Sequence, residues 1–139
     1  MKKLNKILAT GIAVAGVVCM TVTAYAYTSK TFTVNNVPIT ASLSHVDTDD
    51  TSPVLRDSVT ATTSSSSVMD SLTAEATIYY SEILGTTLKT VTDGNSEANA
   101  KKCSVTVYES RTGVGYRGEG THKASHAKKS GSCNTVETW

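Results

Sequence analysis

The sequence has little net charge, which excludes one large class of partners. Its 139 residues include 13 lysines and arginines and 12 aspartates and glutamates, so the formal net charge is +1. Residues 47–97 hold nine acidic and two basic residues, whereas residues 98–139 hold seven basic and three acidic ones. Proteins that bind nucleic acids usually present a strongly basic domain. We therefore expect no nucleic-acid partner.

Motifs for catalysis and metal binding are also missing. There is no G-x-S-x-G nucleophile elbow, although serines abound. The acidic stretch with Asp47, Asp49 and Asp50 lacks the glycine and terminal glutamate of an EF-hand, so it indicates a solvated loop rather than a calcium site. We therefore predict that the protein is not an enzyme and carries no metal or other cofactor. A small hydrolase that pairs two of its carboxylates is the alternative.

The sequence has a single long apolar run, which lies near the N-terminus. Ile7–Val22 follows three lysines and precedes Ala24-Tyr25-Ala26, which is the layout of a signal peptide with its cleavage site. The run is shorter than the roughly 20 residues of a membrane-spanning helix. We predict a signal peptide over residues 1–26, cleaved after Ala26 or, as second choice, after Ala24, so that no membrane span is left. An uncleaved anchor is the alternative. The lysine-led start resembles signal peptides of Gram-positive secreted proteins.

Cleavage would leave residues 27–139 as a single domain with ten basic and twelve acidic residues. Cys103 and Cys133 are the two cysteines of that domain. An even number of cysteines in an exported domain indicates a disulfide, so we predict that these two are bonded. Two buried free thiols are one alternative. A zinc site with His122 and His126 is a weaker one, because the cysteines lack the C-x₂₋₄-C spacing of structural zinc sites.

Serine and threonine make up 37 of these 113 residues, about a third, and threonine together with valine favours strands. Apolar and polar residues alternate with a period of two in many stretches. Asn35-Asn36 predicts a hairpin turn, and Asp93-Gly94 predicts another turn. The predicted strands cover residues 31–34, 37–43, 54–63, 72–84, 86–94, 103–110, 115–126 and 133–139.

Residues 72–84 fit a helix as well as a strand. Leu72, Ala76 and Ile83 share a helical face, but Leu72, Ala76 and Ile78 also alternate with polar residues. The threonines and paired tyrosines favour an extended chain, so we predict a strand. About eight short strands separated by turns indicate an all-β protein, a small antiparallel β-sandwich. This architecture resembles small exported Gram-positive β-sandwich proteins, some bacteriocins among them.

His122 and His126 lie four residues apart in a segment that also contains three lysines. In a helix they would be neighbours and could bind zinc together. Glycines and flanking turns favour a strand, in which residues four apart are separated by ~13 Å. We therefore expect separate histidines with structural or surface roles. Lys123, Lys128 and Lys129 indicate a solvated face, with a patch for anionic wall polymers or lipids as the alternative.

The aromatic residues could form a stacking surface for a ligand, or they could cap the core. The candidate ligand surface consists of Tyr79, Tyr80, Tyr116, His122, Lys123, His126 and Trp139. The function that fits best is a secreted, non-enzymatic interaction module, extracellular or associated with the cell wall. Its partner would be a cell-wall polymer or another envelope component. The alternative is a bacteriocin-like antimicrobial or toxin that acts on a neighbour's cell envelope.

Overall fold

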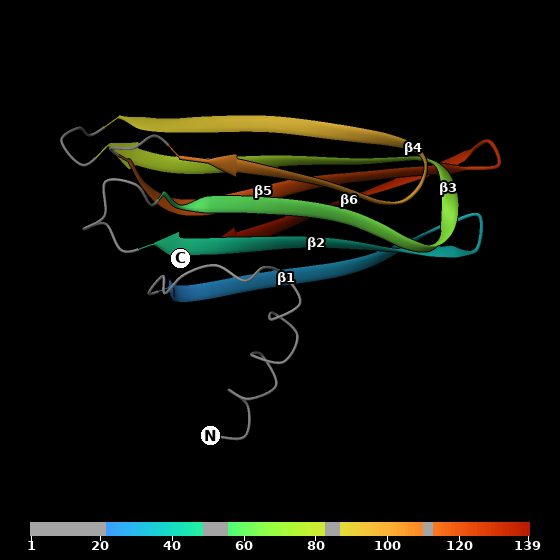
Figure 1. Cartoon of the computed structure of the whole chain (residues 1–139), viewed down its shortest axis with the longest axis horizontal. Helices are drawn as coiled ribbons and strands as arrows, with labels where there is room; N and C mark the ends of the chain where they lie inside the picture. The colour runs from blue at the N-terminus through green and yellow to red at the C-terminus, as the bar shows by residue number, and fades with distance from the viewer. Residues whose placement is uncertain (1–21, 49–55, 83–86, 110–112) are drawn as a thin grey trace, which may run out of the picture.

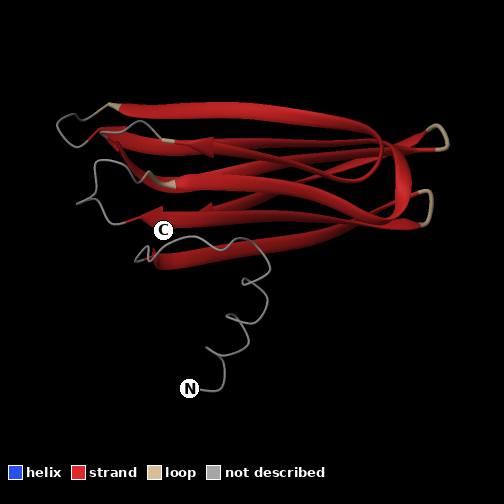
Figure 2. Ribbon diagram, in the orientation of Figure 1, coloured by secondary structure: helices blue, strands red, loops and turns tan. Residues whose placement is uncertain are grey.

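The computed structural model describes residues 22–48, 56–82, 87–109 and 113–139. These residues form strands joined by short turns, without a helix, so the all-β prediction is confirmed (Figure 2). This part of the chain therefore holds no helix with the length and apolar character that crossing a membrane requires. The strands are β1 (Val22–Val34), β2 (Val37–Thr48), β3 (Ser58–Glu82), β4 (Leu88–Tyr108), β5 (Gly113–His126) and β6 (Lys129–Thr138).

All strand pairs are antiparallel and belong to one curled sheet, in the order β1-β2-β3-β5-β6, with β4 paired to β3 (Figure 1). The two strands at the ends of this order approach each other. Lys30 Nζ on β1 donates a hydrogen bond of 2.8 Å to the carbonyl of Asn134 on β6, and Thr28 Oγ1 lies 3.4 Å from the carbonyl of Val136. The sheet is therefore nearly barrel-shaped, and the predicted sandwich of two sheets is not confirmed.

Two long strands explain why there are six strands in place of the predicted eight. β3 has 25 residues and joins the predicted strands 54–63 and 72–84 through the serine run. β4 has 21 residues and joins the predicted strands 86–94 and 103–110. The turn predicted at Asp93-Gly94 is wrong, because both residues continue the ladder with β3 and no described glycine has a positive φ.

β3 and β4 bend together, so that their two halves lie on opposite sides of the core (Figure 1). The register between them shifts between Ser64 and Met69, and Asn99 on β4 has a φ of 51°. Asparagine tolerates this left-handed conformation better than most residues. As a result, the first half of β3 pairs with β2, whereas its second half pairs with β5.

The remaining hairpins have two-residue turns. Asn35 and Asn36 have φ values of 49° and 64°, which confirms the turn predicted there. Ala127 and Lys128 have the same pair of φ values, so the turn between β5 and β6 comes earlier than expected. β6 consequently begins at Lys129 rather than at the predicted residue 133.

The predicted signal peptide mostly lies outside the described residues, which begin at residue 22, and it stays a prediction. β1 includes Val22–Ala26, so cleavage after Ala26 would remove the first five residues of this strand. The residues from Tyr27 onward would keep their pairing with β2. The predicted acidic loop also falls largely outside the described residues, including Asp49 and Asp50.

The core is formed by the inward-facing residues of every second position along the strands. Its largest fully buried apolar side chains are Ile39, Leu43, Met69, Leu72 and Ile78. The outward-facing positions of the same strands are mostly serine and threonine. Cross-strand hydroxyl pairs join them, for example Thr60 to Thr106 at 2.7 Å and Thr77 to Thr92 at 2.8 Å. Most of the serines and threonines of these strands therefore lie on the outer faces of the sheet, with Thr63 and Thr135 as buried exceptions.

A glycine on β5 provides a test of this packing. A Cβ atom at Gly120 would lie 2.6 Å from Thr135 Oγ1 and 2.7 Å from His122 Nε2, whereas at Gly94 the nearest atom would be 3.7 Å away. We expect Gly120→Ala to cost about 1–3 kcal/mol through overpacking, which corresponds to roughly 5–15 °C in Tm. Gly94→Ala is the matched control and should leave Tm unchanged or slightly raised. Equal melting curves for the two variants would contradict the close packing at Gly120.

Candidate functional site

The outer face of β3, β5 and β6 carries a shallow groove near the β5–β6 turn. Antiparallel pairing places Ser71 beside Ser125 and Ser125 beside Ser130. In the next outward-facing row, Lys123 lies between Thr73 and Ser132. The residues are side by side because cross-strand neighbours on one face are only about 5 Å apart. Three strands thus contribute polar side chains to one surface.

The groove has a volume of about 340 Å³ and is lined mainly by hydroxyl groups. Its lining residues are Ser71, Thr73, Lys123, Ala124, Ser125, Ser130, Gly131 and Ser132. Lys123 is the one charged residue among them, and it is exposed. Hydroxyls can donate and accept hydrogen bonds, and the ammonium donates three. This donor-rich, carboxylate-free lining suits a ligand with anionic and hydroxyl oxygens.

The β5–β6 turn adds positive charge beside the groove. Lys128 and Lys129 are exposed at this turn. Asp70 holds the turn in place, since its Oδ2 accepts a 2.9 Å hydrogen bond from the backbone N–H of Ala127. The same carboxylate lies 3.5 Å from His126 Nδ1. Asp70, which follows the bend in the middle of β3, therefore holds the turn, and the two lysines are exposed to solvent.

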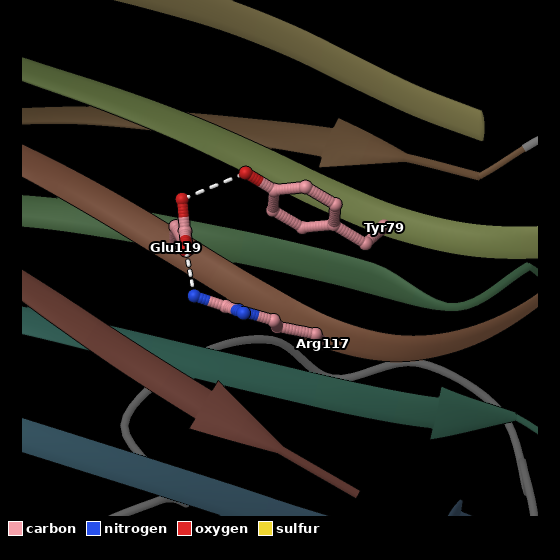
Figure 3. A network of polar contacts seen from close by, with 3 residues as sticks. All are labelled: Tyr79, Arg117 and Glu119. Atoms are coloured by element: carbon pink, nitrogen blue, oxygen red, sulfur yellow. Dashed lines mark hydrogen bonds and ion pairs between the residues drawn. The ribbon is translucent and has the colours of Figure 1, made fainter. Parts of the chain in front are cut away.

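Further along the same face, three polar side chains form a network (Figure 3). The Tyr79 hydroxyl donates a 2.8 Å hydrogen bond to Glu119, and Arg117 forms an ion pair with the other oxygen of this carboxylate. The Arg117 guanidinium also lies 5.4 Å from the centre of the Tyr79 ring. Hydrogen bonding to Glu119, followed by desolvation, raises the pKa of Tyr79. Tyr116 lies beside it, with ring centroids 6.4 Å apart.

The structure divides the predicted ligand surface into separate groups. Tyr79 and Tyr116 lie together on the outer face, and Lys123 lies in the groove on the same face. Tyr80 is only 6% exposed, so it belongs to the core. Trp139 is partly buried and packs against the core from the far end of the sheet. Tyr80 and Trp139 therefore cap the core, whereas a stacking surface formed by Tyr79 and Tyr116 stays a prediction.

The two histidines that are four apart have different surroundings. β5 is a strand from end to end, as predicted. His122 is fully buried, and its ring nitrogens lie 3.0 Å from Thr63 Oγ1 and 2.9 Å from Thr135 Oγ1. Burial lowers the pKa of His122 to about 4, so the ring is neutral at physiological pH. It fixes β3, β5 and β6 to one another and is closed to ligands, whereas His126 is half exposed beside Asp70.

A second buried histidine, His45, was missed by the sequence analysis. It is fully buried and stacks on Trp139, with ring centroids 3.3 Å apart and planes 13° apart. Neither ring nitrogen has a hydrogen-bond partner among the described residues. Burial lowers its pKa to about 4, and the nearby charge of Asp57 opposes this shift. The alternation of Ile39 and Leu43 extends to His45 and could have predicted that it faces inward.

Two acidic residues lie near this stacked pair. Asp57 and Glu109 are 2% and 4% exposed. Asp57 Oδ2 accepts a 3.1 Å hydrogen bond from the N–H of Gly115, and the backbones of Asp57 and Glu109 are joined by a 3.1 Å hydrogen bond. Trp139 fills the adjacent space, since a Cβ atom at Gly115 would lie 3.0 Å from its ring. These acids fix the ends of three strands, and the lining of the groove does not include them.

The predicted disulfide is absent: Cys103 and Cys133 are free thiols. Cys103 pairs with Thr63 on β3, and Cys133 pairs with His122 on β5. Since Thr63 and His122 lie between the two cysteines, the Cα atoms are not placed within the roughly 7 Å that a disulfide spans. Cys103 Sγ instead donates to the carbonyl of Asn95 at 3.2 Å. Burial raises the pKa of both thiols.

We expect replacement by phenylalanine to change the free energy of unfolding differently at the two buried histidines. His45→Phe removes no hydrogen bond and keeps the stack on Trp139, so we expect stability at pH 7 within about 1 kcal/mol of wild type. His122→Phe leaves two buried threonine hydroxyls without this partner and should cost about 1–3 kcal/mol. Urea unfolding followed by the fluorescence of Trp139, the single tryptophan, measures both. Equal losses would contradict the difference in hydrogen bonding.

His45 also predicts a dependence of stability on pH. Its pKa is lowered from 6.5 to about 4 in the folded protein, so between these values the unfolded chain binds a proton that the folded chain does not. The free energy of unfolding is therefore highest above pH 6.5 and falls as the pH decreases toward 4. We expect His45→Phe to reduce this fall by roughly 2–3 kcal/mol. If the free energy of unfolding falls equally for wild type and variant between pH 7 and 4, His45 does not titrate in this way.

Comparison with known proteins assigns no family to this chain. No family model matches it, and no curated protein matches it with statistical support. Among the described residues, no group of three or more histidine, cysteine or acidic side chains is arranged to hold a metal ion. The candidate site is therefore the groove around Lys123 together with the Tyr79–Arg117–Glu119 network on the same face, and its function is inferred from this geometry.

Proposed function

We propose that this chain is a secreted, non-enzymatic binding protein that holds an anionic polymer of the bacterial cell envelope in the groove around Lys123. The observation that carries the proposal is the lining of the groove, in which hydroxyls surround one ammonium group and no carboxylate is present. A carboxylate would repel phosphate or carboxylate groups of a ligand. The exposed Lys128 and Lys129 extend the positive charge at the edge of the groove.

The same face offers a second contact region for a long ligand. Lys123 and Arg117 are six residues apart on β5, which is about 20 Å in a strand. At that distance Tyr79 and Tyr116 present partly exposed rings that can pack against sugar rings. Outward-facing Thr121 lies between the two regions, with the exposed Glu75 opposite it on β3, so the sugar or polyol part of the ligand would lie there. A polymer that combines sugars or polyols with anionic groups can contact both regions at once, and small molecules cannot.

The non-enzymatic part of the proposal is supported by the surroundings of the groove hydroxyls. A serine or threonine nucleophile needs a base within hydrogen-bonding reach. Among the described residues, Thr73 Oγ1 lies 3.2 Å from Ser96 Oγ, and no histidine or carboxylate is hydrogen-bonded to a groove hydroxyl. The buried His45 and His122 face the core and do not line this surface. The groove is therefore better suited to binding than to cleavage.

Cosedimentation with insoluble cell walls tests the proposal. Purified protein should sediment with Gram-positive walls that carry their anionic polymers, and much less with walls stripped of them by hydrofluoric acid. Lys123→Glu should reduce the bound fraction about tenfold, because it replaces attraction with repulsion inside a small groove. Binding of the wild type should weaken as salt increases.

Lys102→Glu is the matched control, since Lys102 is also exposed but lies on β4 opposite Ser64, outside the groove lining. It makes the same change in net charge and should bind nearly as well as wild type. No soluble wall fragments should be released in any of these mixtures. Equal losses from the two variants, or equal binding to stripped walls, would refute an anion site at Lys123, and released fragments would refute the non-enzymatic function.

A further inference from the structure

β4 has an edge along its whole length that no other described strand pairs with. Among the described strands it pairs with β3 alone, and it is the outermost strand of its layer at the top of Figure 1. Most of its residues are exposed, and Leu88 at its start is 67% exposed. An unpaired strand edge presents backbone N–H and C=O groups that can form a ladder with another strand. Most proteins protect such an edge, and 21 residues is long for an unprotected one.

The first part of β4 is complementary to itself when two copies run antiparallel. Its residues Lys89–Asp93 read Lys-Thr-Val-Thr-Asp. If Val91 lies opposite Val91 of a second copy, Thr90 lies opposite Thr92 and Lys89 lies opposite Asp93. Each of these pairs is of a kind that stabilises a sheet: apolar with apolar, hydroxyl with hydroxyl, and cation with anion. By symmetry, the hydroxyl pair and the ion pair each occur twice.

We propose that two copies of this chain form a dimer by joining their β4 strands antiparallel, with the two-fold axis at Val91. This is an isologous contact, in which the same segment of both copies forms the interface. The strands that pair with β4 in each copy then belong to one continuous sheet that runs through both copies. The proposal is independent of the groove, which lies on β3, β5 and β6.

The surroundings of the charged residues support this arrangement. Asp93 is exposed, and its carboxylate accepts a 2.8 Å hydrogen bond from the N–H of Gly94, with no cation beside it among the described residues. Lys89 is close to Glu82 in its own chain, and its side chain is still 43% exposed. The second copy would bring Lys89 to Asp93. It would also place the exposed Leu88 over Gly94, where no side chain obstructs it.

Other registers either bring like charges together or leave Lys89 and Asp93 without an opposite charge, as with the axis at Thr92, where Lys89 would face Asn95. With the axis at Asp93, Lys89 would face Glu97, but Asp93 would face itself. With the axis at Asn95, Asp93 would face Glu97, and Lys89 would face Lys101. Like charges directly opposite each other destabilise a sheet. The register centred on Val91 is therefore the one in which both Lys89 and Asp93 face an opposite charge.

Analytical ultracentrifugation over a concentration series tests the dimer. The short interface predicts a dimer that dissociates on dilution. Asp93→Lys should weaken association about tenfold or more, because it turns two attractive pairs into two repulsive ones. The double variant Lys89→Glu with Asp93→Lys restores opposite charges and should recover most of the affinity.

Glu97→Lys is the matched control, because it makes the same charge change on the same exposed strand but lies outside the paired segment. It should associate like wild type. The thermal unfolding of each variant shows whether the fold is intact. A monomer at all concentrations, equal effects of Asp93→Lys and Glu97→Lys, or no recovery in the double variant would each overturn the proposal.

Crosslinking tests the register itself. Val91→Cys would place two cysteines opposite each other at the axis, at a Cα separation of about 4.5–5.5 Å that permits a disulfide. We expect covalent dimers of this variant after treatment with diamide. Leu88→Cys, at an exposed position, would face Gly94 and should stay monomeric under the same treatment, as should the wild type with Cys103 and Cys133. Crosslinking through Leu88→Cys and not through Val91→Cys would overturn the proposed register.

Discussion

The bend shared by β3 and β4 is the constraint on which the rest of the structure depends. Without it, these two strands would form a flat hairpin with few apolar contacts. Hydrogen bonds across the bend hold the two halves together: Thr63 Oγ1 donates to the carbonyl of Thr73 at 2.8 Å, and Asn95 Nδ2 donates to the carbonyl of Ser104 at 3.2 Å. By folding back, the hairpin places β2 on one side of the core and β5 on the other. The core is therefore enclosed between the two halves of the bent β3–β4 hairpin and the strands that pair with them.

The polar core follows from the same bend. Thr63 lies on the first half of β3, and His122 on β5 is fixed to the second half, so their hydrogen bond joins the two sides of the core. A buried polar pair costs little when both partners are satisfied. His45 has no such partner and is held by its contact with Trp139 instead. The two ends of the core are thus maintained differently, one by hydrogen bonds and the other by ring stacking.

The period of two predicted the strands and the inward faces because it depends only on local chemistry. For residues 72–84, where a helical period fitted as well, the threonines and paired tyrosines decided for the extended chain. If followed further along β2, the period of two includes His45. The number of strands was wrong because the turn propensity of Asp93-Gly94 was overridden by pairing with β3, and the serine run became a bend inside a strand. The disulfide was predicted from the cysteine count, which holds no information on distance. The groove could not be predicted either, because it depends on which strands become neighbours.

The polar groups of the outer surface are distributed differently over the faces and the edge of the sheet. Serine and threonine satisfy one another in cross-strand pairs, which keeps the faces polar without concentrating charge. The few charged residues on this surface are therefore distinctive. Lys123 is the one charged residue in the lining of the groove, and Lys89 and Asp93 lie four residues apart on the edge strand β4. A ligand on a sheet face must be recognised by side chains, whereas a strand at an edge is also recognised by the backbone. The lining of the groove thus suits the oxygen-rich ligand that we propose, and the charges along the edge of β4 suit an extended chain with complementary charges, which a second copy of β4 possesses.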